Sequence, residues 1–430
     1  MDASQRQAAA AIVRVMAGTT LAKALEDSAA QASPARSFVH ELAYGTLRHW
    51  GTLEAIVRAL AHQMPGDPML VAILAVALYQ LEHMRAEPHA VVDRAVAAAG
   101  DAVRPQAKGL ANALLRRYLR ERDGVLARVN ATPVARWSHP RWWIARVRSD
   151  WPGEWERILE AGNARPPLTL RANPRVNSRE ALVARLRAAA VECEPVGESG
   201  VILAAARPVR ELPGFDEGAF SVQDAGAQLA AHLLGARDGE RVLDACAAPG
   251  GKATHVLERA DVALLALDSD ASRLVRVHEN LARLRLADRR VQVAAGDAAS
   301  PASWWDGVPF DRIVADVPCT ASGIVRRHPD VKWLRRASDV ASFARVQSAM
   351  LDALWGCLAR GGTLLYVTCS VFVEENETQA EAFAARTPDA LRESCDFPAD
   401  ARGSGGQLLP SLPGAPHNQD GFFYARFRKA

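Results

Sequence analysis

The chain has 430 residues, of which 49% are hydrophobic and 23% charged, and its formal net charge is +3. This length predicts more than one domain, because single hydrophobic cores stop growing at about 250–300 residues. The small net charge does not by itself indicate a nucleic-acid-binding protein. Local basic clusters, Arg116-Arg117-Tyr118-Leu119-Arg120 and Arg326-Arg327-His328, can nevertheless hold phosphates. For either cluster alone, a solvated helix face is an equally good interpretation.

The N-terminal segment and the cysteines indicate the cellular compartment. No apolar run reaches the ~20 residues that a membrane span needs, and residues 1–7 lack the basic and then apolar plan of a signal peptide. Six cysteines without a Cys-x-x-Cys pair form neither a disulfide framework nor a zinc site. We therefore expect a cytoplasmic protein with reduced thiols, no bound metal and no membrane association.

Residues 1–132 are predicted to form an all-helical domain of about five to seven helices. Ala, Leu and Arg dominate this part of the chain, and apolar residues recur at three- and four-residue steps, for example over 71–81. Turns are predicted at Pro65–Pro68 and at Gly100-Asp101.

Residues 133–220 differ in composition and are predicted to form a small α/β connector domain. Tryptophans concentrate over 137–155, and short apolar runs then alternate with one helix. We expect strands at 168–172 and 200–203 and a capped helix over 178–190.

Residues 221–430 alternate between strand and helix patterns. The predicted helices include 272–286 and 338–358, and the predicted strands are 241–244, 263–268, 291–294, 311–316 and 363–368. This alternation predicts a doubly wound, Rossmann-like, mostly parallel sheet. The tail over 421–428 is expected to add a last edge strand.

A glycine-rich turn, Asp244-Ala-Cys-Ala-Ala-Pro-Gly-Gly-Lys252, follows the first strand of this domain and opens a helix. Small residues there allow close approach to a ligand, and Gly250 and Gly251 can adopt positive φ. Ala253 follows Lys252, which excludes a phosphate-binding P-loop, and the turn is not the Gly-x-Gly-x-x-Gly of dinucleotide sites.

Three successive strands each end in aspartate, at Asp268, Asp297 and Asp316. Open α/β sheets bind ligands at this edge, and a carboxylate in the place of Asp268 can accept both hydroxyls of a ribose. Helix capping explains any one of these residues, but it explains the series poorly. The pattern therefore predicts a cofactor that carries a nucleoside.

Two cysteines also leave neighbouring strands, Cys319 after the fourth and Cys369 after the fifth. Adjacent strands lie about 4.8 Å apart, so both thiols are expected in one crevice with Asp316 and Lys252. A single buried cysteine is ordinarily a small hydrophobic residue, whereas two that converge on a charged pair favour a chemical role. Lys252 is expected to lower the pKa of a thiol. The residues themselves do not rank the two cysteines.

These motifs resemble those of the Sun family of RNA cytosine-5 methyltransferases. They are Ser221-Val-Gln-Asp224, the 244–252 turn, Asp316-Val-Pro-Cys319, Asp330-Val-Lys-Trp333, Thr368-Cys-Ser370 and Glu374-Glu-Asn376. Tyr44–Arg48 and Lys108–Arg117 are similar to the helical, NusB-like domain of family members, so the resemblance runs nearly end to end. Three positions depart from the family pattern: Val317, Thr320 and Gln419, of which Gln419 is expected to change the contacts of its loop.

The resemblance implies a class I methyltransferase domain with a seven-stranded sheet over 221–430, a NusB-like RNA-binding domain over 1–132, and S-adenosylmethionine as cofactor. Cys369 is then the nucleophile, Cys319 assists product release, Asp316 contacts the target base, Asp268 binds ribose and Asp297 adenine, and Lys252 lies near the centre. The expected cofactor-binding residues are Cys246, Ala247, Ala248, Pro249, Gly250, Gly251, Lys252, Asp268, Arg273, Asp297, Ala298 and Asp316.

The expected reaction is methylation of carbon 5 of one cytosine in small-subunit (16S) ribosomal RNA, through a covalent cysteine–carbon 6 intermediate, by a monomeric enzyme. A thiolate that adds to carbon 6 makes carbon 5 nucleophilic, and a carboxyl group near N3 stabilises the charge that develops there. Two alternatives remain: the same reaction on transfer RNA, and a non-catalytic RNA-binding factor of ribosome assembly. Four intact chemical side chains, Cys369, Cys319, Asp316 and Lys252, argue against the second.

Overall fold

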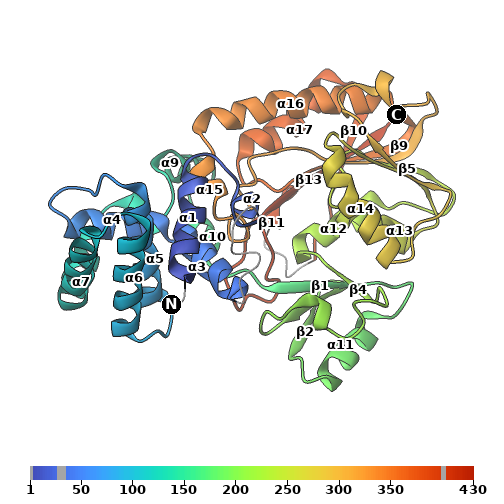
Figure 1. The fold of residues 1–430 in the computed structure, drawn as a ribbon. Coiled ribbons are helices and arrows are strands. Elements are labelled where there is room, and N and C mark those ends of the chain that lie inside the picture. The colour runs from blue at the N-terminus through green and yellow to red at the C-terminus, as the bar shows by residue number, and fades with distance from the viewer. Residues whose placement is uncertain (1–2, 27–34, 399–402) are drawn as a thin grey trace. The chain divides into compact units, whose positions relative to one another are not determined.

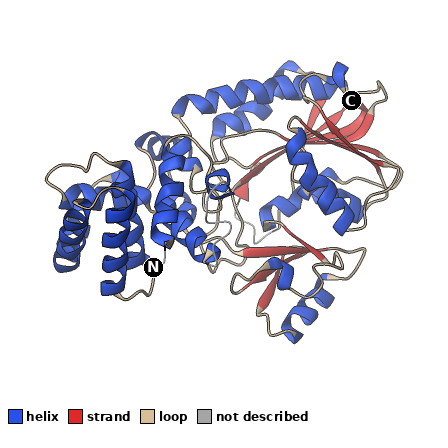
Figure 2. Ribbon diagram, viewed as in Figure 1, coloured by secondary structure: helices blue, strands red, loops and turns tan. Residues whose placement is uncertain are grey.

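The computed structural model describes residues 3–26, 35–398 and 403–430 and divides into two compact units. The first unit comprises Met1–Ala164 with Val325–Ala337, and the second comprises Arg165–Ile324 with Ser338–Ala430. Figure 1 follows the chain through its elements, and Figure 2 shows that strands are confined to the second unit among the described residues. None of the helices in the described ranges is long and apolar enough to cross a membrane.

All elements of the first unit within the described residues are helices, as predicted for residues 1–132. Its described helices are α1 (Ser4–Met16), α2 (Leu21–Glu26), α3 (Arg36–Arg48), α4 (Trp50–Leu60), α5 (Pro68–His83), α6 (Pro88–Ala102), α7 (Ala107–Val129), α8 (Pro133–Trp137), α9 (Arg141–Asp150), α10 (Trp155–Asn163) and α15 (Val331–Leu334). The predicted turn at Pro65–Pro68 is confirmed, because Asp67 caps α5 by accepting from the Met69 N–H.

The turn predicted at Gly100-Asp101 is wrong, because both residues lie inside α6. Gly100 lies beside the exposed Lys108 of α7: a Cβ at this position would lie 1.9 Å from Lys108 Cε, so that flexible side chain would have to move.

The segment Val325–Ala337 belongs to the helical unit although it lies far along the chain. Asp330 accepts from the Leu21 N–H, and the Trp333 indole N–H donates to the Leu47 carbonyl. The ammonium of Lys332 is fully buried and donates to the carbonyls of Arg48 and Ser138 and to Asn163 Oδ1 at 2.7–2.8 Å. The Asp330–Trp333 motif therefore binds this segment to the other helices of the unit.

The second unit begins with an antiparallel sheet of order β2-β3-β1-β4, formed by β1 (Leu168–Ala172), β2 (Cys193–Val196), β3 (Gly200–Leu203) and β4 (Phe220–Val222). Helix α11 (Arg179–Ala188) accompanies this sheet, and the Ser178 hydroxyl caps it by accepting from the Ala181 N–H. The predicted elements of the connector are thereby confirmed. Residues 133–164, however, group with the helical unit.

A nine-stranded sheet forms the rest of the second unit, in the order β11-β12-β13-β9-β8-β5-β6-β7 with β10 also on β13. The strands are β5 (Arg241–Asp244), β6 (Ala263–Asp268), β7 (Val291–Ala295), β8 (Phe310–Asp316), β9 (Leu358–Thr368), β10 (Ala390–Glu393), β11 (Gly403–Ser404), β12 (Gln407–Leu408) and β13 (Phe422–Lys429). The pairs among β5 to β9 are parallel and the rest antiparallel, which confirms the doubly wound, mostly parallel prediction.

Helices cover both faces of this sheet. Residues of α12 (Ala225–Leu234), α13 (Gly251–Arg259) and α14 (Ala271–Arg283) share one hydrophobic core with it, and residues of α16 (Ala337–Gly356) and α17 (Glu377–Arg386) share the other. The double cover explains the nearly continuous apolar runs of the parallel strands.

The end of the sheet differs from prediction in two respects. β13 is an interior strand, because β9 pairs with one side of it while β10 and β12 pair with the other. The seven strands that the resemblance implied become nine because the two-residue strands β11 and β12 form a hairpin that joins the sheet where β12 pairs with β13. Two-residue strands such as β12 leave no periodicity to detect in a sequence.

Candidate active site

A pocket lies at the C-terminal ends of the parallel strands β5 to β9, the edge at which open α/β sheets bind ligands. It is lined by Ala245, Cys246, Ala248, Asp268, Ser269, Arg273, Gly296, Asp297, Ala298, Asp316, Val317, Pro318, Cys319, Ala321, Val346, Met350 and Cys369. Nine of the predicted site residues belong to this lining: Cys246, Ala248, Asp268, Arg273, Asp297, Ala298, Asp316, Cys319 and Cys369. The other five, Ala247, Pro249, Gly250, Gly251 and Lys252, belong to the turn after β5 and the start of α13 and do not line the pocket.

The turn after β5 has the backbone conformation that its glycines predicted. Gly250 adopts φ +102° at the N-cap of α13, and its N–H donates to the Ala247 carbonyl at 2.6 Å. A side chain at Gly250 would be strained by this φ and would also touch the backbone of Val277 at 3.4 Å. Gly251 takes ordinary helical geometry as the first residue of α13.

Asp268 lies almost fully buried at the end of β6 and is held by the turn. Its Oδ2 accepts from the Ala248 N–H at 3.1 Å and its Oδ1 from the Asp270 N–H at 3.1 Å. Arg273 donates to the Ala248 carbonyl at 3.0 Å and contacts Asp268 Oδ1 at 3.4 Å. Asp270, not Asp268, caps α14 by accepting from the Ser272 N–H. Capping therefore does not explain Asp268, whose carboxylate faces the pocket with lone pairs to spare.

The other two strand-end aspartates have different surroundings. Asp297 caps the turn that follows it, because Oδ1 accepts from the Ala299 N–H at 2.9 Å. Asp316 forms an ion pair with Lys252, whose Nζ lies 2.6 Å from Oδ2. Asp268 accepts the Asp270 N–H in the same way, and the 3-10 helix after Asp297 has Ser300 as its N-cap, so helix capping explains none of the three.

Both predicted thiols converge in the pocket, with Cys319 Sγ and Cys369 Sγ 3.4 Å apart. The hydrogen bond with Cys369 and burial raise the pKa of the Cys319 thiol well above its usual range. Cys319 is therefore a thiol at neutral pH and can donate its S–H to the sulfur of Cys369. Lys252 pairs with Asp316, whose charge raises the pKa of the ammonium against the opposing effect of burial. The charge of Lys252 is not among the causes that shift the pKa of the Cys319 thiol, so the expected lowering does not extend to Cys319.

Sequence reasoning missed the residue that holds the two cysteine loops together, the fully buried Glu375. Oε1 accepts from the Thr320 N–H at 2.8 Å, and Oε2 accepts from the hydroxyls of Thr320 and Ser370. The Gln347 amide donates to Oε1 at 3.3 Å. Each of the two cysteines precedes a residue that Glu375 holds, so one carboxylate fixes both loops. Its place in the Glu374-Glu375-Asn376 motif was the available signal.

Other missed lining residues are apolar or strained. Val346 and Met350 are four residues apart on α16 and face the pocket on one side of that helix. Ala321, two residues after Cys319, adopts φ +59°, an uncommon conformation for a residue with a side chain. The departure at Gln419 has a role in packing: this fully buried side chain donates to the Leu409 carbonyl and bonds to His417 Nδ1 at 2.7 Å.

Asp244, at the end of β5, predicts a pH dependence of stability. Neither of its oxygens accepts a hydrogen bond of normal geometry from a described residue, although the N–H groups of Cys246 and Ala253 lie close enough to lower its pKa. Burial, and secondly the charge of Asp316, raise that pKa from 3.8 to about 7, against the opposing charge of Lys252.

The folded protein therefore keeps a proton on Asp244 that the unfolded chain has lost, so this residue costs stability increasingly as pH rises from about 4 to about 7. Denaturant titration measures the free energy of unfolding of Asp244→Asn and of the unmodified protein. The value for the variant minus that for the unmodified protein should increase with pH over this window and level off above it. A difference that stays constant from pH 5 to pH 8 would contradict the assignment.

Three family models match the chain. The one described as 16S rRNA methyltransferase RsmB/F matches residues 231–428, the RsmF/B-like ferredoxin-like domain matches 139–210, and the NusB family matches 2–120. These matches confirm the predicted NusB-like domain and the Rossmann-like methyltransferase domain. They also identify the fold of the connector as ferredoxin-like.

Curated relatives match over nearly the whole length. Ribosomal RNA small subunit methyltransferase B of Vibrio cholerae serotype O1 is 42% identical over 98% of this chain and 96% of its own. The protein of the same name from Pseudomonas putida is 44% identical over 92% of this chain and 90% of its own. The crystal structure of PH0851 has the same fold, with a TM-score of 0.78 and 22% identity over 99% of both chains. The chain therefore belongs to the family of ribosomal RNA small subunit methyltransferase B, whose members are S-adenosylmethionine-dependent enzymes.

Proposed function

We propose that the protein methylates carbon 5 of one cytosine in small-subunit (16S) ribosomal RNA, with S-adenosylmethionine as methyl donor and a covalent bond between Cys369 and carbon 6 of the base. One observation carries the proposal: two thiols 3.4 Å apart line one pocket together with Asp316, which is paired with Lys252. Methyl transfer to an oxygen, a nitrogen or a protein side chain needs neither thiol.

The chemistry of the pocket suits S-adenosylmethionine. The buried carboxylate of Asp268 can accept ribose hydroxyls, and Val346 and Met350 offer apolar contact to a flat ring near Asp297 and Ala298. We assign these residues to the nucleoside and the turn over 246–252, with Arg273, to the rest of the cofactor. When bound, the cofactor supplies an electrophilic methyl group on a positively charged sulfur.

The protein's own residues then activate the base. The Cys369 thiolate forms a bond to carbon 6, which turns the aromatic ring into an enamine and makes carbon 5 a nucleophile. Asp316 contacts the base at N3, where a proton shared between N3 and the carboxyl group offsets the negative charge that the attack places on the ring. Lys252 holds this carboxyl group in place at 2.6 Å. The S–H of Cys319 is able to stabilise the attacking sulfur by donating to it.

Product release restores the aromatic ring. After methylation, carbon 5 loses its proton to a base, the carbon 6–sulfur bond breaks, and its electron pair returns to Cys369 as thiolate. Cys319 is a good partner for this step, because its raised pKa keeps a proton next to the departing sulfur. The net products are methylated cytosine, S-adenosylhomocysteine and one proton. The target base must leave its stack to reach the pocket.

The test is to incubate the purified full chain with radiolabelled S-adenosylmethionine and unmodified small-subunit RNA, as naked RNA and as assembled particle, and to identify labelled nucleosides by mass spectrometry. 5-Methylcytosine at one ribosomal position is the expected result, from a monomeric cytoplasmic enzyme. Label in transfer RNA alone would overturn the substrate, and cofactor binding without transfer to any RNA would favour the non-catalytic assembly factor.

A further inference from the structure

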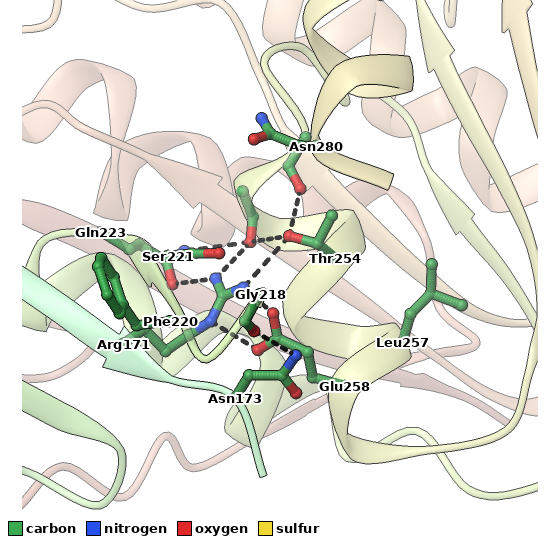
Figure 3. A network of polar contacts seen from close by, with 12 residues as sticks. Arg171, Asn173, Gly218, Phe220, Ser221, Gln223, Thr254, Leu257, Glu258 and Asn280 are labelled. Atoms are coloured by element: carbon green, nitrogen blue, oxygen red, sulfur yellow. Dashed lines mark hydrogen bonds and ion pairs between the residues drawn. The ribbon is translucent and has the colours of Figure 1, made fainter. Parts of the chain in front are cut away.

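Arg171, on strand β1 of the connector sheet, lies at the centre of a buried polar network (Figure 3). Its side chain is fully buried and forms a bidentate ion pair with the equally buried Glu258 of α13, at 2.9 Å from Nε and 2.6 Å from Nη2. Removing both ions of such a pair from water is unfavourable unless their remaining hydrogen-bonding groups are also satisfied. The remaining N–H donors of Arg171 also have partners.

Those donors reach the glycine turn. Nη1 donates to the Gly251 carbonyl at 2.7 Å and to Gln223 Oε1 at 2.6 Å, and Nη2 also donates to the Thr254 hydroxyl at 3.2 Å. The Thr254 hydroxyl in turn donates to the Gly250 carbonyl at 2.8 Å. With the two bonds to Glu258, all five guanidinium N–H groups are used. A fork of this kind fixes direction as well as distance.

We infer that Arg171 is a positioning residue for the cofactor turn, so that the connector domain sets the affinity of the methyltransferase domain for S-adenosylmethionine. The inference rests on the proposed placement of the cofactor at this turn. Gly250 bends the backbone into positive φ at the point where α13 begins. Arg171 clamps the carbonyls of Gly250, through Thr254, and of Gly251, and a turn held at both carbonyls presents its neighbours Ala247 and Ala248 in one conformation.

A second arginine provides a matched control. Arg175, also in the connector, binds the opposite end of the same helix: it donates to the carbonyls of Leu257 at 2.7 Å and Ala260 at 3.2 Å and pairs with Asp261 at 2.8 Å. Both arginines attach the connector to α13, but Arg171 alone of the two contacts the glycine turn. If attachment were the whole role of Arg171, both substitutions would have the same consequences.

The experiment compares full-length variants by calorimetric titration with S-adenosylhomocysteine and by thermal unfolding without ligand. Arg171→Met alone leaves Glu258 buried without its partner and endangers folding, so the informative variant is Arg171→Met with Glu258→Leu, which replaces the ion pair by apolar side chains of similar size. We expect its Kd to rise by about tenfold or more, since the bond to the Gly251 carbonyl is lost and the Thr254 hydroxyl, which holds the Gly250 carbonyl, loses its donor. Its melting temperature is expected to stay close to that of the unmodified protein.

Two further variants complete the design. Arg171→Lys keeps the charge without the fork and should show an intermediate Kd, whereas Arg175→Met should lower the melting temperature and leave Kd unchanged. An unchanged Kd in the double variant, or an equal loss in Arg175→Met, would overturn the inference. Asp268→Ala separates this outcome from failure of the cofactor assignment itself: if Asp268→Ala also binds normally, the cofactor does not occupy this pocket.

Discussion

Replacing Cys319 by alanine is expected to trap the protein on its RNA as a covalent adduct, and replacing Cys369 to abolish methyl transfer. Loss of the nucleophile removes the covalent route altogether, so the rate with Cys369→Ala should fall by about four orders of magnitude or more. Loss of Cys319 leaves attack possible but removes the proton held 3.4 Å from the departing sulfur. The intermediate then forms and fails to collapse.

The adduct is measured as a species of reduced mobility in denaturing gels that disappears after nuclease treatment. It should form with Cys319→Ala and be absent with Cys369→Ala and with the double variant. Cys246→Ala is the matched control, because Cys246 lines the same pocket but burial raises its pKa well above the usual range, which makes it a poor nucleophile. An adduct with Cys369→Ala instead would exchange the roles of the two cysteines, and none in any variant would refute the thiol mechanism.

The sequence predicted the parallel part of the sheet well because its strands are buried on both faces and read as apolar runs. All five predicted strands from 241–244 to 363–368 were found, along with the helices between them. The carboxyl ends of these strands meet at one edge of the sheet. Residues that directly follow the strands therefore lie close together, whatever the conformation of the loops. This is why Cys319, Cys369, Asp316 and Asp268 were predictable as one site.

The errors arose where tertiary packing overrides a local signal. Gly100 suggests a turn, but it lies inside α6, beside the Lys108 side chain. The Asp330–Trp333 motif lies between two elements of the sheet domain, yet the partners of Lys332 are carbonyls of the helical unit. Nothing local reveals that a segment inserted in one domain completes the core of another. A deletion of residues 1–132 therefore also removes Arg48, a partner of Lys332, so the contribution of the helical unit to RNA binding is better tested by surface substitutions in the full chain.

Residues that act through other residues were the least predictable part of the site. Arg171 and Glu375 touch neither thiol, and each lies in a different element from the groups it holds. A motif in a sequence shows that a residue is present, whereas its role follows from the acceptors and donors that folding brings to it.

Glu375→Ala is expected to lower kcat by at least about a hundredfold, because four donors that fix the two cysteine loops lose their acceptor. Burial raises the pKa of this carboxyl group, and the hydrogen bonds from Thr320, Ser370 and Gln347 oppose the shift. These donors therefore stabilise the charged carboxylate, and the carboxylate holds the donors in place. Leaving those donors unsatisfied should also cost about 2–4 kcal/mol of folding free energy. Glu375→Gln keeps the shape but turns an N–H₂ group toward existing donors, and should recover stability more than activity.

The decisive comparison is between kcat and cofactor affinity. A positioning role predicts that kcat and adduct formation in a Cys319→Ala background fall together, while the Kd for S-adenosylhomocysteine stays within about twofold, since Glu375 contacts no predicted cofactor residue. Glu377→Gln is the control: its carboxylate pairs with Arg392 away from the pocket, and its loss should change neither quantity. Two outcomes would contradict this role: full activity of Glu375→Gln, or a loss of activity in both Glu375 variants that only matches the fraction of unfolded protein. The carboxylate would then contribute to stability alone, and the strands would suffice to set the 3.4 Å separation of the thiols.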